Sequence, residues 1–143
     1  MSANAGTSVP LRVLIVEDNR DARTTMRLLL TMAHGYAVHE AADGASGVQA
    51  ALDARPDVAL IDLGLPDVDG CEVAKRIRGA LGAATVLVAL TGYASDDDKR
   101  RAAAAGFDHY LVKPVHRPAL LAIFDEIARA KRSAARAARE ERS

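Results

Sequence analysis

The sequence predicts an α/β fold in which one five-stranded parallel sheet is covered by helices on both faces. The chain has 143 residues, which corresponds to one domain, and half of them are hydrophobic, enough for one core. Five short apolar runs alternate with five segments of helical periodicity. Strands joined by helices pair in parallel with right-handed crossovers. We therefore expect a doubly wound sheet with the strand order 2-1-3-4-5 and five helices.

The expected strands are short runs of mainly aliphatic residues, which are typical of strands buried on both faces of a parallel sheet. LRVLIV is almost unbroken, and DVALID and TVLVAL have the same character. YAVHEA is a plausible second strand, and the fifth strand ends in a lysine that precedes a proline. The strands are expected at residues 11–16, 36–41, 57–62, 85–90 and 108–113.

The segments between the strands carry apolar residues at helical spacing. Met26, Leu29 and Leu30 belong to such a stripe, and Gly35 is expected to end this helix. Ser95 is expected to cap the fourth helix, because three aspartates follow it in the first turn, where the helix dipole favours negative charge. The helices are expected at residues 19–33, 44–54, 70–81 and 95–105, with a fifth that starts near residue 118.

Composition divides the chain into three parts. Residues 1–10 are mostly small and polar, so we expect a flexible leader before a domain at residues 11–128. Residues 129–143 form a basic, Ala-rich helical extension or tail with six Lys or Arg and two Glu. The rest of the chain then holds 13 basic (19 − 6) and 17 acidic (19 − 2) residues. This mildly acidic body offers no broad basic face, so we expect no direct nucleic-acid binding.

Several protein classes are excluded by composition. The apolar runs are far shorter than the roughly 20 residues that a membrane helix needs. The first residues lack the charged and apolar regions of a secretory signal. A single cysteine, Cys71, excludes an internal disulfide framework and fits a reducing cytoplasm. We therefore expect a cytoplasmic protein that does not bind membranes.

Polar side chains stand at the ends of four of the five expected strands. Glu17 and Asp18 follow the first strand, and Asp62 ends the third. Thr91 follows the fourth strand, and Lys113 ends the fifth. Each residue alone has an ordinary structural explanation as a helix cap, a turn residue or a surface charge. Because the carboxyl ends of parallel strands meet at one edge of a sheet, their joint occurrence favours a functional site there.

Three carboxylates at one edge of a sheet require a counter-charge. Two unit charges about 4 Å apart repel by roughly 4 kcal/mol at an effective dielectric constant near 20. Oxygen ligands without His or Cys favour a hard cation, and a few carboxylates with open water positions suit Mg²⁺. Lys113 can hold a phosphoryl oxygen, and Thr91 adds a hydroxyl donor. These groups together indicate phosphoryl transfer, with Asp62 as the nucleophile.

The pattern resembles the response-regulator receiver family of two-component and phosphorelay signalling. The similarity extends over about residues 11–128 and implies a flavodoxin-like fold. It is carried by the acidic pair Glu17-Asp18, by the stretch DLGLPDVDG that begins at Asp62, by the triplet LTG that begins at the last residue of the fourth strand, Leu90, and by Lys113-Pro114.

The resemblance implies that Asp62 accepts a phosphoryl group from a phosphohistidine of a sensor histidine kinase or a histidine phosphotransfer protein. Asp18, Asp62 and the backbone carbonyl of Gly64 would bind Mg²⁺, and Glu17 would act mostly through water. Such a protein promotes its own phosphorylation and dephosphorylation, and we expect no turnover of a separate substrate.

The resemblance also implies how the phosphoryl group is held and sensed. Lys113 and Thr91 would bind its oxygens, and the bond from Lys113 to Pro114 is commonly cis in the family. Thr91 and Tyr110 would form the switch that changes the face made by the fourth helix, the fifth strand and the fifth helix. Two copies of the chain could pair through this face. Tyr93 is a weaker candidate that would screen the attacking water.

Two settings and two alternatives remain open at this point. The chain is either a single-domain response regulator or the receiver of a hybrid histidine kinase, because about 15 residues after the last packed helix are too few for a helix-turn-helix domain. A phosphorylation-independent interaction module with the same fold is the main alternative. A flavin carrier is disfavoured, because the strand ends are acidic and lack aromatic stacking residues.

Overall fold

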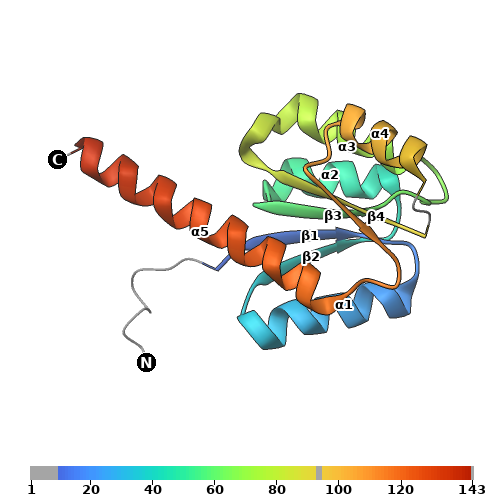
Figure 1. The fold of residues 1–143 in the computed structure, drawn as a ribbon, viewed down its shortest axis with the longest axis horizontal. Helices are drawn as coiled ribbons and strands as arrows, with labels where there is room; N and C mark the ends of the chain where they lie inside the picture. Colours follow the sequence, from blue (N-terminus) through green and yellow to red (C-terminus); the bar gives the residue numbers. More distant parts are fainter. Residues whose placement is uncertain (1–9, 93–94, 143) are drawn as a thin grey trace.

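The computed structural model describes residues 10–92 and 95–142, which form one parallel sheet between two layers of helices (Figure 1). The sheet order is β2-β1-β3-β4-β5, as the sequence predicts. The strands are β1 (Arg12–Val16), β2 (Ala37–Ala41), β3 (Val58–Asp62), β4 (Val86–Thr91) and β5 (His109–Val112). The helices are α1 (Arg20–His34), α2 (Gly44–Ala54), α3 (Gly70–Leu81), the short 3₁₀ helix η2 (Gly82–Ala84), α4 (Asp96–Ala105) and α5 (Arg117–Arg142).

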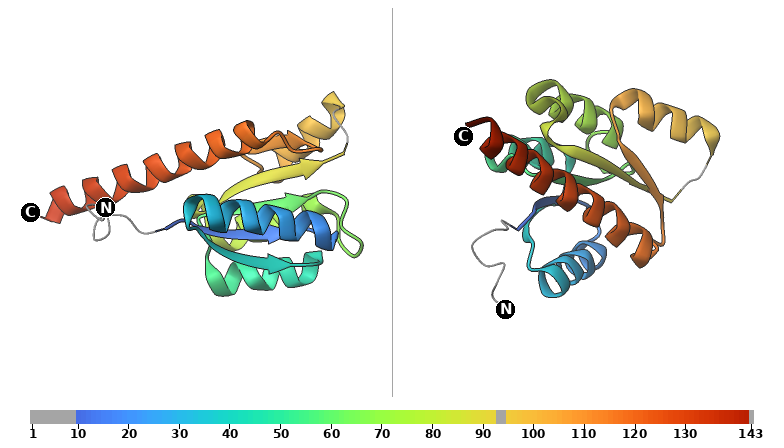
Figure 2. Two further views of the ribbon diagram at one scale, coloured as in Figure 1. Left: turned by 90° about the horizontal axis from the view of Figure 1, so that it is seen from below. Right: turned by 60° about the vertical axis from the view of Figure 1, so that its left-hand side comes forward.

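Side chains that alternate along the strands build a core on each face of the sheet. Leu14 and Ile61 belong to the core under α2, α3 and α4. Ile15 and Leu60 belong to the core under α1 and α5, where Phe124 is fully buried. Figure 2 shows the sheet between these two helical layers. Each large aliphatic side chain that is fully buried contributes about 1.5–3 kcal/mol, so β3, which is buried throughout, forms the centre of the fold.

Side-chain caps account for the boundaries of the helices. Asn19 accepts a hydrogen bond from the Ala22 N–H group, so α1 begins one residue later than expected. Ser95 caps α4 as predicted, by accepting a hydrogen bond from the N–H group of Asp98. Gly35 ends α1 in the left-handed conformation, where φ is 66°. The bounds of α2 and α3 agree with the prediction, whereas η2 was not predicted.

The last helix, α5, continues without a break past the edge of the sheet (Figure 2). Leu120, Phe124 and Ile127 are its buried residues. One turn farther, the Lys131 Nζ atom lies 2.9 Å from Asp57 Oδ2, and most residues beyond this ion pair are exposed.

No helix among the described residues is both long and apolar enough to cross a membrane. The expected leader as far as residue 9, together with Tyr93, lies outside the described residues.

Candidate functional site

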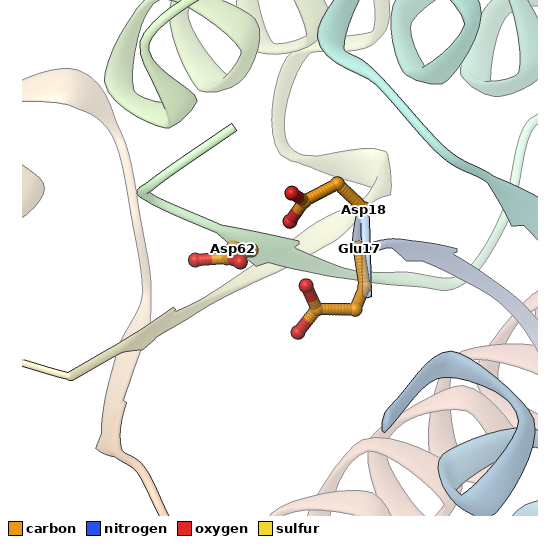
Figure 3. A group of neighbouring side chains, drawn as sticks. All are labelled: Glu17, Asp18 and Asp62. Atoms are coloured by element: carbon orange, nitrogen blue, oxygen red, sulfur yellow. The ribbon is translucent and has the colours of Figure 1, made fainter. Parts of the chain in front are cut away.

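The three predicted carboxylates lie at the carboxyl edge of the sheet. Val16 pairs with Ile61 in the register of β1 and β3, and each strand delivers a carboxylate immediately afterwards. The Glu17 N–H group donates to the carbonyl of Ala41 in β2, at 3.0 Å, which fixes the backbone at this point. Figure 3 shows the side chains of Glu17, Asp18 and Asp62 converging from the ends of the two strands.

The geometry of this acidic cluster suits a divalent cation. Glu17, Asp18 and Asp62 each offer an oxygen atom, and these atoms all lie within 4.8 Å of one another. Glu17 is fully buried and Asp62 is 7% exposed, whereas Asp18 lies at the exposed rim. An all-oxygen set of ligands that opens to water at one side matches the preference of Mg²⁺. The residues present therefore fit this ion.

Among the described residues one cation, Lys113, which directly follows β5, reaches the cluster. Its Nζ atom lies 2.7 Å from Glu17 Oε1 and 3.0 Å from Asp62 Oδ2. The Lys113 N–H group donates to the carbonyl of Thr91 at 2.6 Å, and the peptide bond from Lys113 to Pro114 is cis. A single lysine leaves three carboxylates short of positive charge, which is the condition that favours binding of a metal ion.

Burial and mutual contact separate the proton affinities of these groups. The pKa of Glu17 is raised, chiefly by burial and then by the carboxyl group of Asp62. Burial also opposes ionisation of Asp62, but hydrogen bonds from Glu17, Gly64 and Lys113 outweigh it and lower its pKa. Burial would lower the pKa of Lys113, yet the two carboxylates raise it. As the pH falls, Glu17 therefore takes up a proton before Asp62 does, and Asp62 stays ionised to lower pH.

Two glycines shape the chain after Asp62. The Gly64 N–H group donates to Asp62 Oδ1 at 2.9 Å, which orients that carboxylate. At Gly70, a Cβ atom would lie 2.6 Å from the Asp62 carbonyl oxygen and 2.7 Å from the Leu63 Cα atom. A side chain at position 70 would therefore displace the backbone that carries Asp62, which explains why glycine stands eight residues after it.

Thr91 and Tyr110 connect the site to the last strand. Thr91 is 4% exposed at the end of β4, and Tyr110 in β5 packs against the core under α3 and α4. The pKa of Tyr110 is raised mainly by burial, with a hydrogen bond to Thr91 acting in the opposite direction. The two residues of the expected switch are thus in direct contact.

Arg23 is a site residue that the sequence did not reveal. Its Nη1 atom donates to the backbone carbonyl of Glu17 at 2.8 Å, and its Nε atom lies 3.2 Å from Glu40 Oε1. This contact holds the first acidic residue against α1 and β2. An arginine on an amphipathic helix is ordinary, so no signal in the sequence distinguishes it.

Comparison with known proteins identifies the family. The model of the family described as response regulator receiver domain matches residues 13–125 of this chain. The chain belongs to this family. KdpE, a transcriptional regulatory protein of Mycobacterium tuberculosis, is 38% identical over 102 residues, covering 71% of this chain and 44% of that protein. This receiver domain thus spans about half the length of the curated relatives it matches.

Solved receiver domains have the same architecture. A CheY-like receiver domain protein from Methanospirillum hungatei superposes with a TM-score of 0.79 at 28% identity, covering 87% of this chain and 99% of that one. The receiver domain of the sensor histidine kinase PA1611 from Pseudomonas aeruginosa has a TM-score of 0.75 at 32% identity, covering 84% and 98%. The latter structure holds a magnesium ion in its active-site cleft.

The predicted family and fold are therefore confirmed. The chain is a receiver domain of two-component signalling, and its acidic triad is consistent with the magnesium site of such domains. Receiver domains are phosphorylated by histidine kinases.

Proposed function

We propose that this receiver domain accepts a phosphoryl group on Asp62 from a phosphohistidine of a sensor histidine kinase or a histidine phosphotransfer protein. An Asp62 carboxylate oxygen attacks phosphorus, so an O–P bond forms as the P–N bond breaks. The electron pair of the broken bond returns to the imidazole nitrogen of the donor. The observation that carries the proposal is the contact of Lys113 Nζ with Asp62 Oδ2, at 3.0 Å, inside a cluster of three carboxylates.

Asp18, Asp62 and the backbone carbonyl of Gly64 would hold Mg²⁺, and Glu17 would act mostly through water. The bound ion would supply neutralisation of the carboxylates and of the phosphoryl oxygens. Lys113 and Thr91 would bind phosphoryl oxygens, so Lys113 would give up part of its contact with Asp62. Two observations support the proposal. Carboxylate oxygens of Glu17, Asp18 and Asp62 lie within 4.8 Å of one another, and Thr91 is buried.

The phosphoryl group would act as a switch through its charge. It adds about −1.5 to −2 charges and three acceptor oxygens, and it favours a conformation that contacts it better. The contact between Thr91 and Tyr110 supports a path from the site to the α4-β5-α5 face. This face would then bind an output partner or a second copy. The exchange would take place in the cytoplasm, either in a single-domain regulator or in a hybrid kinase.

The test is incubation with Mg²⁺ and acetyl phosphate, followed by intact-mass measurement. Wild type should gain the mass of one phosphoryl group, and Asp62→Asn should lose this gain completely. Asp53→Asn is the matched control, because Asp53 is exposed on α2 and forms no part of the acidic cluster. It should behave as wild type. A gain that persists in Asp62→Asn would contradict the proposal, and a gain in none of the proteins would favour the phosphorylation-independent module.

A further inference from the structure

The loop between β3 and α3, residues 63–69, is tied to the amino end of α2 by Asp67. The Gly44 N–H group donates to Asp67 Oδ1 at 2.7 Å, and the Ala45 N–H group donates to Asp67 Oδ2 at 3.0 Å. The first of these bonds and then the second lower the pKa of Asp67, so the side chain is an anion at neutral pH. The positive end of the α2 dipole favours this anion further.

The loop and the helix approach each other too closely for a side chain at Gly44. A Cβ atom there would lie 2.9 Å from the Cβ atom of Val68 and 3.2 Å from Asp67 Oδ1. The first distance is shorter than real Cβ contacts, so the glycine is needed for this packing. The loop therefore rests against the first turn of α2 and has little freedom to slide along it.

The same helix also supports the end of β1. A Cβ atom at Gly47 would lie 2.8 Å from the Val16 Cγ1 atom, which shows how tightly α2 packs on the strand. Val16 directly precedes the acidic pair Glu17-Asp18. The helix α2 is therefore a common support for the acidic end of β1 and for the loop that carries Gly64.

We propose that Asp67 is a positioning residue of the magnesium site, because its bonds to α2 set the place of Gly64 relative to the carboxylates of Asp18 and Asp62. The inference rests on the proposed function, in which the Gly64 carbonyl binds the ion. The Gly64 N–H group already donates to Asp62 Oδ1 at 2.9 Å, so a shift of the loop moves a carboxylate ligand and the carbonyl ligand together. Groups that orient metal ligands from outside commonly change metal affinity by about 10- to 100-fold when removed.

Asp43 provides a matched control at the same end of α2. Its Oδ1 atom accepts hydrogen bonds from the Ser46 N–H group at 2.8 Å and from the Ser46 hydroxyl at 2.7 Å. Asp43 is the N-cap residue of α2 itself and precedes the helix directly. Its replacement removes a cap from α2 without releasing the β3–α3 loop.

The experiment is isothermal titration of Mg²⁺ into wild type, Asp67→Ala, Asp67→Asn and Asp43→Ala, with the NMR signal of the Gly64 amide followed in parallel. Asp67→Ala should raise the Mg²⁺ Kd about 3- to 10-fold, because it acts on the ligands through the loop and not by direct contact. It should also shift the Gly64 signal before Mg²⁺ is added. Asp67→Asn keeps one acceptor and should have a smaller effect, and Asp43→Ala should stay within about twofold of wild type. At saturating Mg²⁺, Asp67→Ala should regain nearly the wild-type rate of phosphorylation by acetyl phosphate.

Two results would overturn the positioning role alone. One is a wild-type Mg²⁺ Kd for both Asp67 variants. The other is an Asp43→Ala variant that binds Mg²⁺ as weakly as Asp67→Ala does, because loss of helix capping would then explain the effect. If Asp67→Ala does not fold by circular dichroism, Asp67→Asn carries the same comparison. If wild type itself neither binds Mg²⁺ nor accepts a phosphoryl group, the proposed function and this inference both fail.

Discussion

The carboxylates at the two edges of the sheet differ in how their charge is balanced. At the amino edge, Asp57 Oδ2 accepts hydrogen bonds from the Arg12 N–H group at 2.8 Å and from Lys131 Nζ at 2.9 Å. At the same edge, Asp108 Oδ2 accepts hydrogen bonds from Arg78 Nη2 at 2.8 Å and from the Leu87 N–H group at 2.9 Å. Each of these carboxylates thus has a matched cation and a backbone donor.

The carboxyl edge lacks this balance. Among the described residues, one lysine, Lys113, pairs with Glu17 and Asp62, which are both buried, while Asp18 adds a third carboxylate to the same cluster. An uncompensated charge of this kind is costly inside a protein unless a ligand offsets it. The comparison teaches that the carboxylates at the amino edge are balanced by contacts within the fold, whereas the unmatched charge at the carboxyl edge is consistent with a magnesium site.

Removing the cation that pairs with Asp108 at the amino edge, Arg78, should have the largest effect on stability. Arg78 donates to the carbonyl oxygens of Gly82, Thr85 and Gly106, besides its pair with Asp108. Arg78→Ala leaves these acceptors without their donor, and we expect it to lower the free energy of unfolding by about 2–3 kcal/mol. Urea denaturation measures this loss. Phosphorylation of Asp62 at a temperature where the variant is folded should stay within about twofold of wild type.

Arg76→Ala is the control for that experiment. Arg76 forms an exposed pair with Glu72 one turn away on α3, where the expected cost is only about 0.3–0.5 kcal/mol. If Arg78→Ala costs no more than Arg76→Ala, or if it abolishes phosphorylation while the protein is folded, the separation of the two edges is wrong.

Supplying the missing charge at the carboxyl edge should stabilise the protein by a smaller amount. Binding to the folded state alone adds about 1.4 kcal/mol at a free Mg²⁺ concentration ten times the Kd. Thermal denaturation with Mg²⁺ and with a chelator should show this gain for wild type and not for Asp18→Asn. Asp21→Asn changes an exposed aspartate of the same segment outside the acidic cluster and should keep the gain. Equal stabilisation of all three proteins would point to a general salt effect.

The smallest expected effect concerns Asp67, a carboxylate at the carboxyl edge whose donors are backbone N–H groups. Its pKa in the folded state lies below the ordinary value of 3.8. The stabilisation it gives is therefore complete above its unfolded pKa and disappears as the pH falls through the folded value. The difference in unfolding free energy between wild type and Asp67→Asn should be largest near neutral pH and shrink in acid. A difference that stays constant down to the acid range would contradict this origin.

The sequence predicted the architecture because its signals are local. Apolar runs marked the strands, and caps such as Ser95 marked helix starts, so the bounds of most elements came within about a residue of the observed ones. The signals that predicted the candidate site were also local, since each charged group directly follows or ends a strand. Parallel pairing then required Glu17 and Asp62 to meet at one edge.

Contacts between residues distant in the sequence could not be predicted in this way. The bonds of Arg78 to the turn at Gly106 and the bonds of Asp67 to α2 carry no pattern in the sequence. Both residues are ordinary at their positions, an arginine late in a helix and an aspartate in a loop. Their roles depend on how neighbouring elements pack, which periodicity does not encode.

The sequence by itself determined which elements form, in what order they pair, and which acidic groups stand at the ends of β1 and β3, because hydrophobic periodicity and strand ends are properties of short segments. Only the tertiary structure decided that Lys113 reaches Glu17, 96 residues away, and that α2 supports both sides of the acidic cluster. These features depend on side-chain reach and close packing across neighbouring elements, which arise when the whole sheet is assembled.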